Sequence, residues 1–109
     1  MVHARFELNG DALVVTPMVR RLDAAAAVDF AETVREHVRG RARVVVSLAH
    51  VEAVDASGIG ALLSILKAMP PGGALRLAHA RPSVRLLLVT TFLDELLPAF
   101  DDLSEALRA

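Results

Sequence analysis

The sequence predicts an α/β fold with a mostly parallel central β-sheet of four to five strands and about four helices. Segments with helical periodicity alternate with short strand-like segments, and Val44-Val45-Val46 is continuously apolar, as in a strand covered on both faces. Strand-helix-strand units in series imply parallel neighbours joined by right-handed crossovers. The predicted order is β-β-α-β-α-β-α-β-α, and a length of 109 residues fits one domain over residues 1–109.

An N-terminal β-hairpin is expected first. Phe6 and Leu8 alternate with polar residues, Asn9-Gly10 is suited to a type I′ turn, and Ala12 to Thr16 form a β-branched strand. Pro17 should end that strand or lie at its edge, because proline cannot donate a ladder hydrogen bond.

The first helix is expected to begin at Asp23, whose side chain is a good N-cap, and to end near Gly40. Apolar residues recur on one face at helical spacing, and this face should be buried: Ala27, Phe30, Ala31, Val34 and Val38.

The centre of the sheet is predicted at Arg43 to Leu48, followed by a second helix from about Ser57 to Met69. The run Pro70-Pro71-Gly72-Gly73 ends this helix. Its expected apolar face has the spacing i, i+3, i+4, i+7: Ile59, Leu62, Leu63 and Leu66.

The C-terminal third is predicted to begin with a strand from Ala74 to His79. Pro82 suits the first turn of a third helix, a weak strand is expected at Glu95 to Ala99, and Asp101-Asp102 should start a short final helix. The third helix would carry Val84, Leu87, Leu88 and Thr91.

Composition excludes several classes of function. The chain has no cysteine, so it forms no disulfide or thiolate zinc site, and its net charge of −1 does not demand a basic face for nucleic acid. The N-terminus has no apolar signal segment, and the stretch from Leu86 to Leu97 is too short to span a bilayer and contains Asp94 and Glu95. We therefore expect a cytoplasmic protein without a cofactor that binds another protein.

The candidate site is Val54-Asp55-Ala56-Ser57-Gly58-Ile59-Gly60, between the central strand and the second helix. In open α/β sheets, function concentrates beyond the carboxyl ends of the strands. A phosphate on Ser57 would lie at the positive end of the helix, where the amides of Gly58, Ile59 and Gly60 are expected to lack helical acceptors.

Two roles are open for the neighbours of this serine. Asp55 either caps the helix or orients the Ser57 hydroxyl, and the glycines either admit another protein's active site or allow tight packing of helix on sheet. An ordinary N-cap at Asp55 or Ser57 fits the same pattern.

Two stretches, Val44-Val45-Val46-Ser47-Leu48 and Val54-Asp55-Ala56-Ser57-Gly58-Ile59-Gly60-Ala61-Leu62-Leu63, resemble the anti-sigma factor antagonists of the STAS domain family. Those proteins carry a strand, then Asp-Ser-Ser-Gly-Leu-Gly or Asp-Ala-Ser-Gly-Leu-Gly, then an apolar helix. The similarity extends to Arg21-Leu22-Asp23-Ala24 and to the run from Leu93 to Leu107. Arg20 stands where many members have glycine, and Ala56 where many have serine or threonine.

The resemblance implies a non-catalytic regulator that switches partners. The unphosphorylated protein would bind an anti-sigma factor with serine kinase activity and free the sigma factor, the kinase would phosphorylate Ser57, and a PP2C-type phosphatase would remove the phosphate. The residues expected to meet the partner are Asp23, Asp55, Ala56, Ser57, Gly58, Ile59 and Gly60.

Other readings have less support in the sequence. A serine hydrolase would need a glycine two residues before Ser57, and nucleotide binding has no Walker motif. A metal site would have to assemble histidines from different predicted elements without paired spacing: His3, His37, His50 and His79. The main rival is a domain of the same fold in a lipid-transporting ABC system or in a signalling scaffold.

Overall fold

The computed structural model describes residues 3–109 and contains a four-stranded sheet in the order β1-β2-β4-β6. β1 and β2 are antiparallel, whereas the β2–β4 and β4–β6 pairs are parallel, which confirms the predicted hairpin and the mostly parallel sheet. The strands of this sheet are β1 (Ala4–Asn9), β2 (Ala12–Pro17), β4 (Arg43–Ser47) and β6 (Ala74–Ala78).

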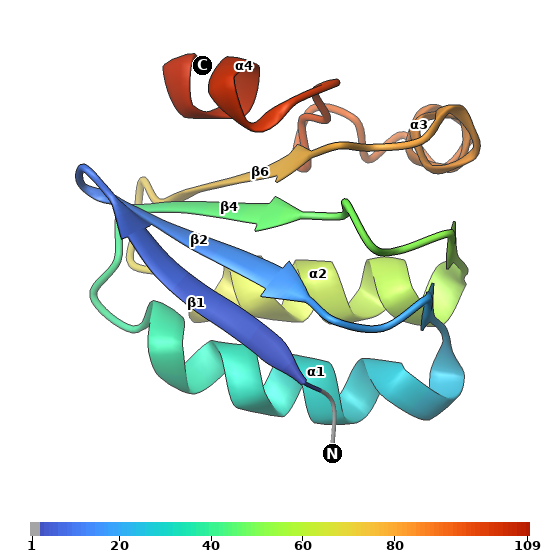
Figure 1. Ribbon diagram of the computed structural model, residues 1–109, viewed down its shortest axis with the longest axis horizontal. Coiled ribbons are helices and arrows are strands. Elements are labelled where there is room, and N and C mark those ends of the chain that lie inside the picture. The colour runs from blue at the N-terminus through green and yellow to red at the C-terminus, as the bar shows by residue number, and fades with distance from the viewer. Residues whose placement is uncertain (1–2) are drawn as a thin grey trace.

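Helices cover both faces of the sheet (Figure 1). α1 and α2 lie side by side below it in this view, α4 lies above it, and α3 lies beyond one end. The helices are α1 (Ala24–Val38), α2 (Ala56–Ala68), α3 (Pro82–Thr90) and α4 (Leu103–Arg108).

Burial on both faces makes β4 the centre of the sheet, as its continuous valines predict. Val44 and Val46 belong to the main core with α1 and α2, whereas Val45 packs with Ala106 of α4 on the opposite face. All three valines are at most 2% exposed. The strand ends at Ser47, one residue before the predicted end.

The two long helices differ in how well their predicted apolar faces agree with the structure. In α1 all five predicted residues are buried, and Gly40 follows the helix with a φ of 76°, a left-handed conformation that glycine adopts without strain. In α2, Ile59 and Leu62 are buried, but Leu63 and Leu66 are only partly buried. The buried face of α2 is completed instead by Gly58, Ala61 and Ile65.

The turn of the hairpin is one residue later than predicted. Asn9 pairs with Ala12, so the loop is Gly10-Asp11 rather than Asn9-Gly10. Gly10 has a φ of 62°, and Asp11 is not among the described residues with positive φ, which is the φ pattern of a type II′ turn with glycine first. Alternation alone could not choose between the two registers, because both leave two residues in the loop.

The C-terminal region differs from the prediction at two strands. Residues 95–99 form no strand, because the amide of Leu97 turns back to the Leu93 carbonyl at 2.9 Å. Only an isolated bridge remains, where Ala99 lies parallel to Leu77 at the edge of β6. The preceding strand ends at Ala78 instead of His79, whose φ of 56° leaves the extended region. Pro82 opens α3 as predicted, with Val84 and Leu88 buried.

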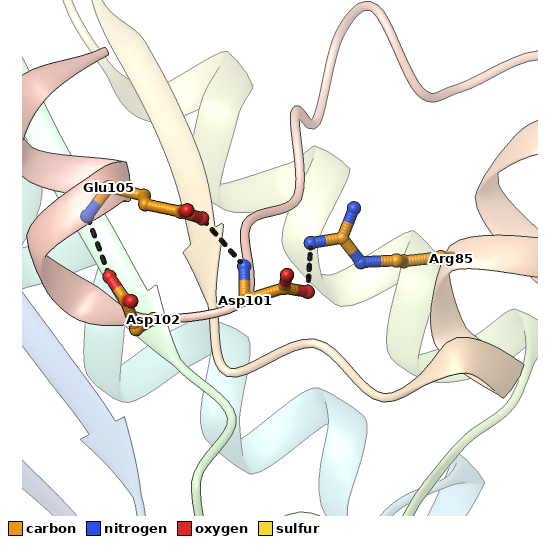
Figure 2. Close-up of polar contacts among 4 residues, drawn as sticks. All are labelled: Arg85, Asp101, Asp102 and Glu105. Atoms are coloured by element: carbon orange, nitrogen blue, oxygen red, sulfur yellow. Dashed lines mark hydrogen bonds and ion pairs between the residues drawn. The ribbon is translucent and has the colours of Figure 1, made fainter.

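The predicted acidic start of the last helix is confirmed (Figure 2). The Asp102 carboxylate accepts the Glu105 amide at 2.8 Å, and the Glu105 carboxylate accepts the Asp101 amide at 3.3 Å. Asp101 also pairs with Arg85 of α3, with an N–O distance of 2.9 Å, so these contacts join α3 to the start of α4.

Candidate functional site

A second, two-stranded sheet places the starts of α1 and α2 next to each other. Each short strand is followed at once by an aspartate and then by a helix, and the two strands pair in parallel: Arg21 with Ala53, and Leu22 with Val54. The strands are β3 (Arg21–Leu22) and β5 (Ala53–Val54), which are too short for a sequence pattern to reveal. Both helices therefore begin at the same end of the molecule (Figure 1).

Asp23 and Asp55 are the N-caps of these two helices. The Asp23 carboxylate accepts the amides of Ala25 and Ala26 at 3.1 and 3.3 Å, and the Asp55 carboxylate accepts those of Ser57 and Gly58 at 2.9 and 3.1 Å. Of the two roles open to Asp55, the structure thus shows the cap. Among residues 3–109 the Ser57 hydroxyl has no hydrogen-bond partner.

The prediction that the amides of Gly58, Ile59 and Gly60 lack helical acceptors holds for Gly58 and is wrong for the other two. The helix begins at Ala56, which makes Ser57 its second residue and moves the following amides deeper into it. The Gly58 amide donates to the Asp55 carboxylate, and the Ile59 amide donates to the Asp55 carbonyl at 3.0 Å. Gly60 lies deeper still, where the carbonyl four residues back is the helical acceptor. The positive helix end remains, but its first amides are already bonded.

Burial divides the predicted partner-binding residues into two groups. Asp55, Ala56, Ser57 and Gly60 are exposed and Asp23 is half-buried. Gly58 and Ile59 are buried, and Ile59, at 4% exposed, belongs to the core. The exposed and half-buried residues are accessible to another protein. The two buried residues are not accessible and contribute to the packing beneath the site.

Gly58 and Gly60 differ in whether the structure leaves room for a side chain at their positions. A Cβ on Gly58 would lie 2.2 Å from the backbone oxygen of Leu22 and 2.8 Å from Cγ1 of Val54, so β3 and β5 leave no room for a side chain there. A Cβ on Gly60 would meet nothing within 4 Å. Tight packing therefore explains Gly58, and only Gly60 opens the surface near Ser57.

Ser57 lines a groove of about 400 Å³ between α1 and α2. Sequence reasoning missed this groove, although its signal is present: small residues at helical spacing on both helices let the groove form. At the Ser64 part of the groove, the Arg35 guanidinium donates to the Ser64 hydroxyl. The lining residues are Ala24, Ala27, Val28, Ala31, Arg35, Ser57, Gly60, Ala61 and Ser64.

Metal-binding geometry is absent from the part of the chain that the structure describes. No group of three His, Cys, Asp or Glu side chains in residues 3–109 is placed to hold an ion. The His37 ring instead stacks on Phe6, with 3.8 Å between ring centroids.

No helix within residues 3–109 has the length and apolar character needed to cross a membrane.

Comparison with known proteins places this fold and motif in one family. The family model of the STAS domain matches residues 4–106, nearly the full chain. The chain belongs to the STAS domain family. No curated protein sequence is similar enough to count as a match.

Solved structures with the same fold include anti-sigma factor antagonists. A STAS domain antagonist from Planctomyces limnophilus is 26% identical, with a TM-score of 0.87, 99% of this chain covered and 97% of the other. An antagonist from Mycobacterium paratuberculosis is 19% identical, with a TM-score of 0.83 and coverages of 99% and 92%. The phosphorylated form of the Bacillus cell fate determinant SpoIIAA is 15% identical, with a TM-score of 0.66 and 97% of both chains covered.

Proposed function

We propose that this STAS domain is an anti-sigma factor antagonist that binds an anti-sigma factor with serine kinase activity and is switched off by phosphorylation of Ser57. The observation that carries the proposal is the state of the Ser57 hydroxyl, which is exposed and has no partner within residues 3–109, beside a groove between two helices. A hydroxyl that serves only to cap a helix would bond to a backbone amide, and Asp55 already performs that task.

Access to this hydroxyl depends on the residues around it. Ala56 is small, Gly60 has no side chain, and a Cβ there would meet nothing within 4 Å. A kinase active site can therefore approach the first turn of α2 closely. Helix propensity alone would place alanine at position 60, since an interior glycine costs about 1 kcal/mol relative to alanine.

A phosphate on Ser57 would act on the partner more than on the fold. It adds about −1.5 to −2 charges at neutral pH. The Asp55 carboxylate is already negative and occupies the amides of Ser57 and Gly58, so the new charge stays at the surface. In a close protein contact it causes repulsion and a desolvation cost, and a loss of about 3 kcal/mol would weaken binding more than a hundredfold.

The relatives support this proposal. The chain is in the same family as an anti-sigma-factor antagonist from Planctomyces limnophilus, and SpoIIAA from Bacillus has a solved phosphorylated form. As part of the same proposal, the protein is a cytoplasmic binding protein without catalytic activity. A PP2C-type phosphatase removes the phosphate from Ser57 and restores binding.

The proposal is tested by calorimetry with the cognate anti-sigma factor kinase. Ser57→Asp should weaken binding at least about a hundredfold, whereas Ser57→Ala should largely preserve it. Ser83 provides a matched control, because it is exposed and is also the second residue of its helix, α3, but does not line the groove. Ser83→Asp should bind like the unmodified protein. Equal affinities of the two Ser57 variants would exclude the electrostatic switch.

A further inference from the structure

The outer edge of β1 is an unpaired strand edge. Within residues 3–109, β1 is the first strand of the sheet and pairs only with β2. In Figure 1 it lies at the near side of the molecule, and no ribbon crosses in front of it. Exposed edges of this length are templates for pairing with another chain, and proteins commonly block them.

The direction of the hydrogen bonds shows which residues present this edge. The Met18 amide donates to the His3 carbonyl at 2.8 Å, so residue 3 points its backbone groups toward β2. In an antiparallel ladder the direction alternates, which turns Arg5 and Glu7 toward β2 and Ala4, Phe6 and Leu8 outward. The position of Pro17 supports this assignment. Pro17 lies opposite Ala4 in the register, and this is a pair without hydrogen bonds between β1 and β2, where the missing amide of proline costs nothing.

The charges on β1 are arranged symmetrically about Phe6. Arg5 and Glu7 are two residues apart and therefore on one face, their side chains are 63% and 61% exposed, and their charged atoms are 3.4 Å apart. If a second β1 lay antiparallel with Phe6 opposite Phe6, each Arg5 would face a Glu7 of the other copy. This register places opposite charges in both directions, and cross-strand pairs of this kind stabilise a sheet.

The same register satisfies the backbone and covers apolar surface. Ala4, Phe6 and Leu8 of each copy would each donate one hydrogen bond and accept one, because all three point outward. Leu8, which is 62% exposed, would lie opposite Ala4 of the other copy on the face where Phe6 stacks on His37. The alternating direction of the backbone groups and the positions of the charges thus both favour the antiparallel alignment with Phe6 opposite Phe6.

We propose that two copies of this chain associate through their β1 strands, antiparallel and centred on Phe6, to form one continuous sheet. The occupant is a second copy because the Arg5 and Glu7 positions complement themselves under a two-fold axis, as an isologous interface requires. An unrelated strand would have no reason to match this order of charges. The surface is separate from Ser57, so the proposal does not depend on the switch.

Sedimentation velocity over a concentration series tests this interface. The unmodified chain should show a reversible dimer. Arg5→Glu and Glu7→Arg should each weaken it about tenfold or more, since each places like charges opposite each other twice per dimer. The double variant Arg5→Glu/Glu7→Arg should restore the dimer, and Arg5→Lys should leave it nearly unchanged. A chain that stays monomeric throughout, or a dimer that the single variants do not weaken, would overturn the proposal.

Amide hydrogen exchange locates the interface independently. Protection of the Phe6 and Leu8 amides should rise with protein concentration, whereas the Glu7 amide, bonded within the hairpin, should be protected throughout. The main competing surface is the segment from residue 86 to residue 96, where Leu86, Val89, Phe92 and Leu96 are each at least 54% exposed. Concentration-dependent protection there, without a change at Phe6 and Leu8, would contradict pairing through β1.

Discussion

The starts of α1 and α2 are built on one plan but differ in the residues that follow the cap. Each comes after a two-residue strand, the two strands pair in parallel, and each helix has an aspartate N-cap that accepts two amides. At the second, third and fifth helical positions, α1 has Ala25, Ala26 and Val28, whereas α2 has Ser57, Gly58 and Gly60. Features that both helix starts share serve to begin a helix, whereas features found at α2 alone need another explanation.

Comparison of the two helix starts separates the residues of the motif that have a structural reason from those that do not. Asp55 does for α2 what Asp23 does for α1, so its carboxylate is explained by capping. Gly58 is explained by the nearby Leu22 carbonyl. Ser57 and Gly60 have no such structural reason, and they are the residues exposed beside the groove. Within the motif, Ser57 and Gly60 are therefore the residues for which a functional role is the better explanation.

The largest effect on stability should come from giving α2 the side chain that α1 has at its third position. Gly58→Ala forces a Cβ against backbone at 2.2 Å and should lower the free energy of unfolding by about 3 kcal/mol, measured by urea denaturation. Gly60→Ala is the matched control, and it should raise the free energy of unfolding by about 1 kcal/mol. Similar stabilities for the two variants would mean that Gly58 is not required for packing.

A smaller and equal effect is expected at the two caps. Asp23→Ala and Asp55→Ala each remove the acceptor of two amides and should each lower the free energy of unfolding by about 1 kcal/mol. Urea denaturation of the two variants side by side measures this. If Asp55→Ala had no effect while Asp23→Ala was destabilising, Asp55 would need a role other than capping.

Much of the fold could be predicted from local patterns. The buried face of α1, its cap at Asp23 and the continuous valines of β4 each follow from periodicity or capping chemistry, and all are confirmed. The errors arose where the local pattern is compatible with more than one backbone arrangement. The turn at Gly10-Asp11 depends on register, and residues 95–99 turn before meeting Leu77 instead of forming a strand.

The candidate site was predictable in its residues but not in its geometry. Ser57 and Asp55 could be found from their position at the start of an apolar helix. The pairing of β3 with β5 could not, because two-residue strands carry no periodic signal, and this pairing creates both the close approach at Gly58 and the adjacent helix starts. The groove between α1 and α2 likewise requires the packing of two helices far apart in sequence.

The most direct test of the account is to incubate the protein with its cognate anti-sigma factor kinase and ATP and to map the phosphate by mass spectrometry. If Ser57 is the switch, one residue is modified, Ser57, and Ser57→Ala incorporates no phosphate. Ser83, at the equivalent position of α3, should stay unmodified in both proteins. Unchanged phosphate incorporation in Ser57→Ala would contradict the claim that Ser57 is the switch.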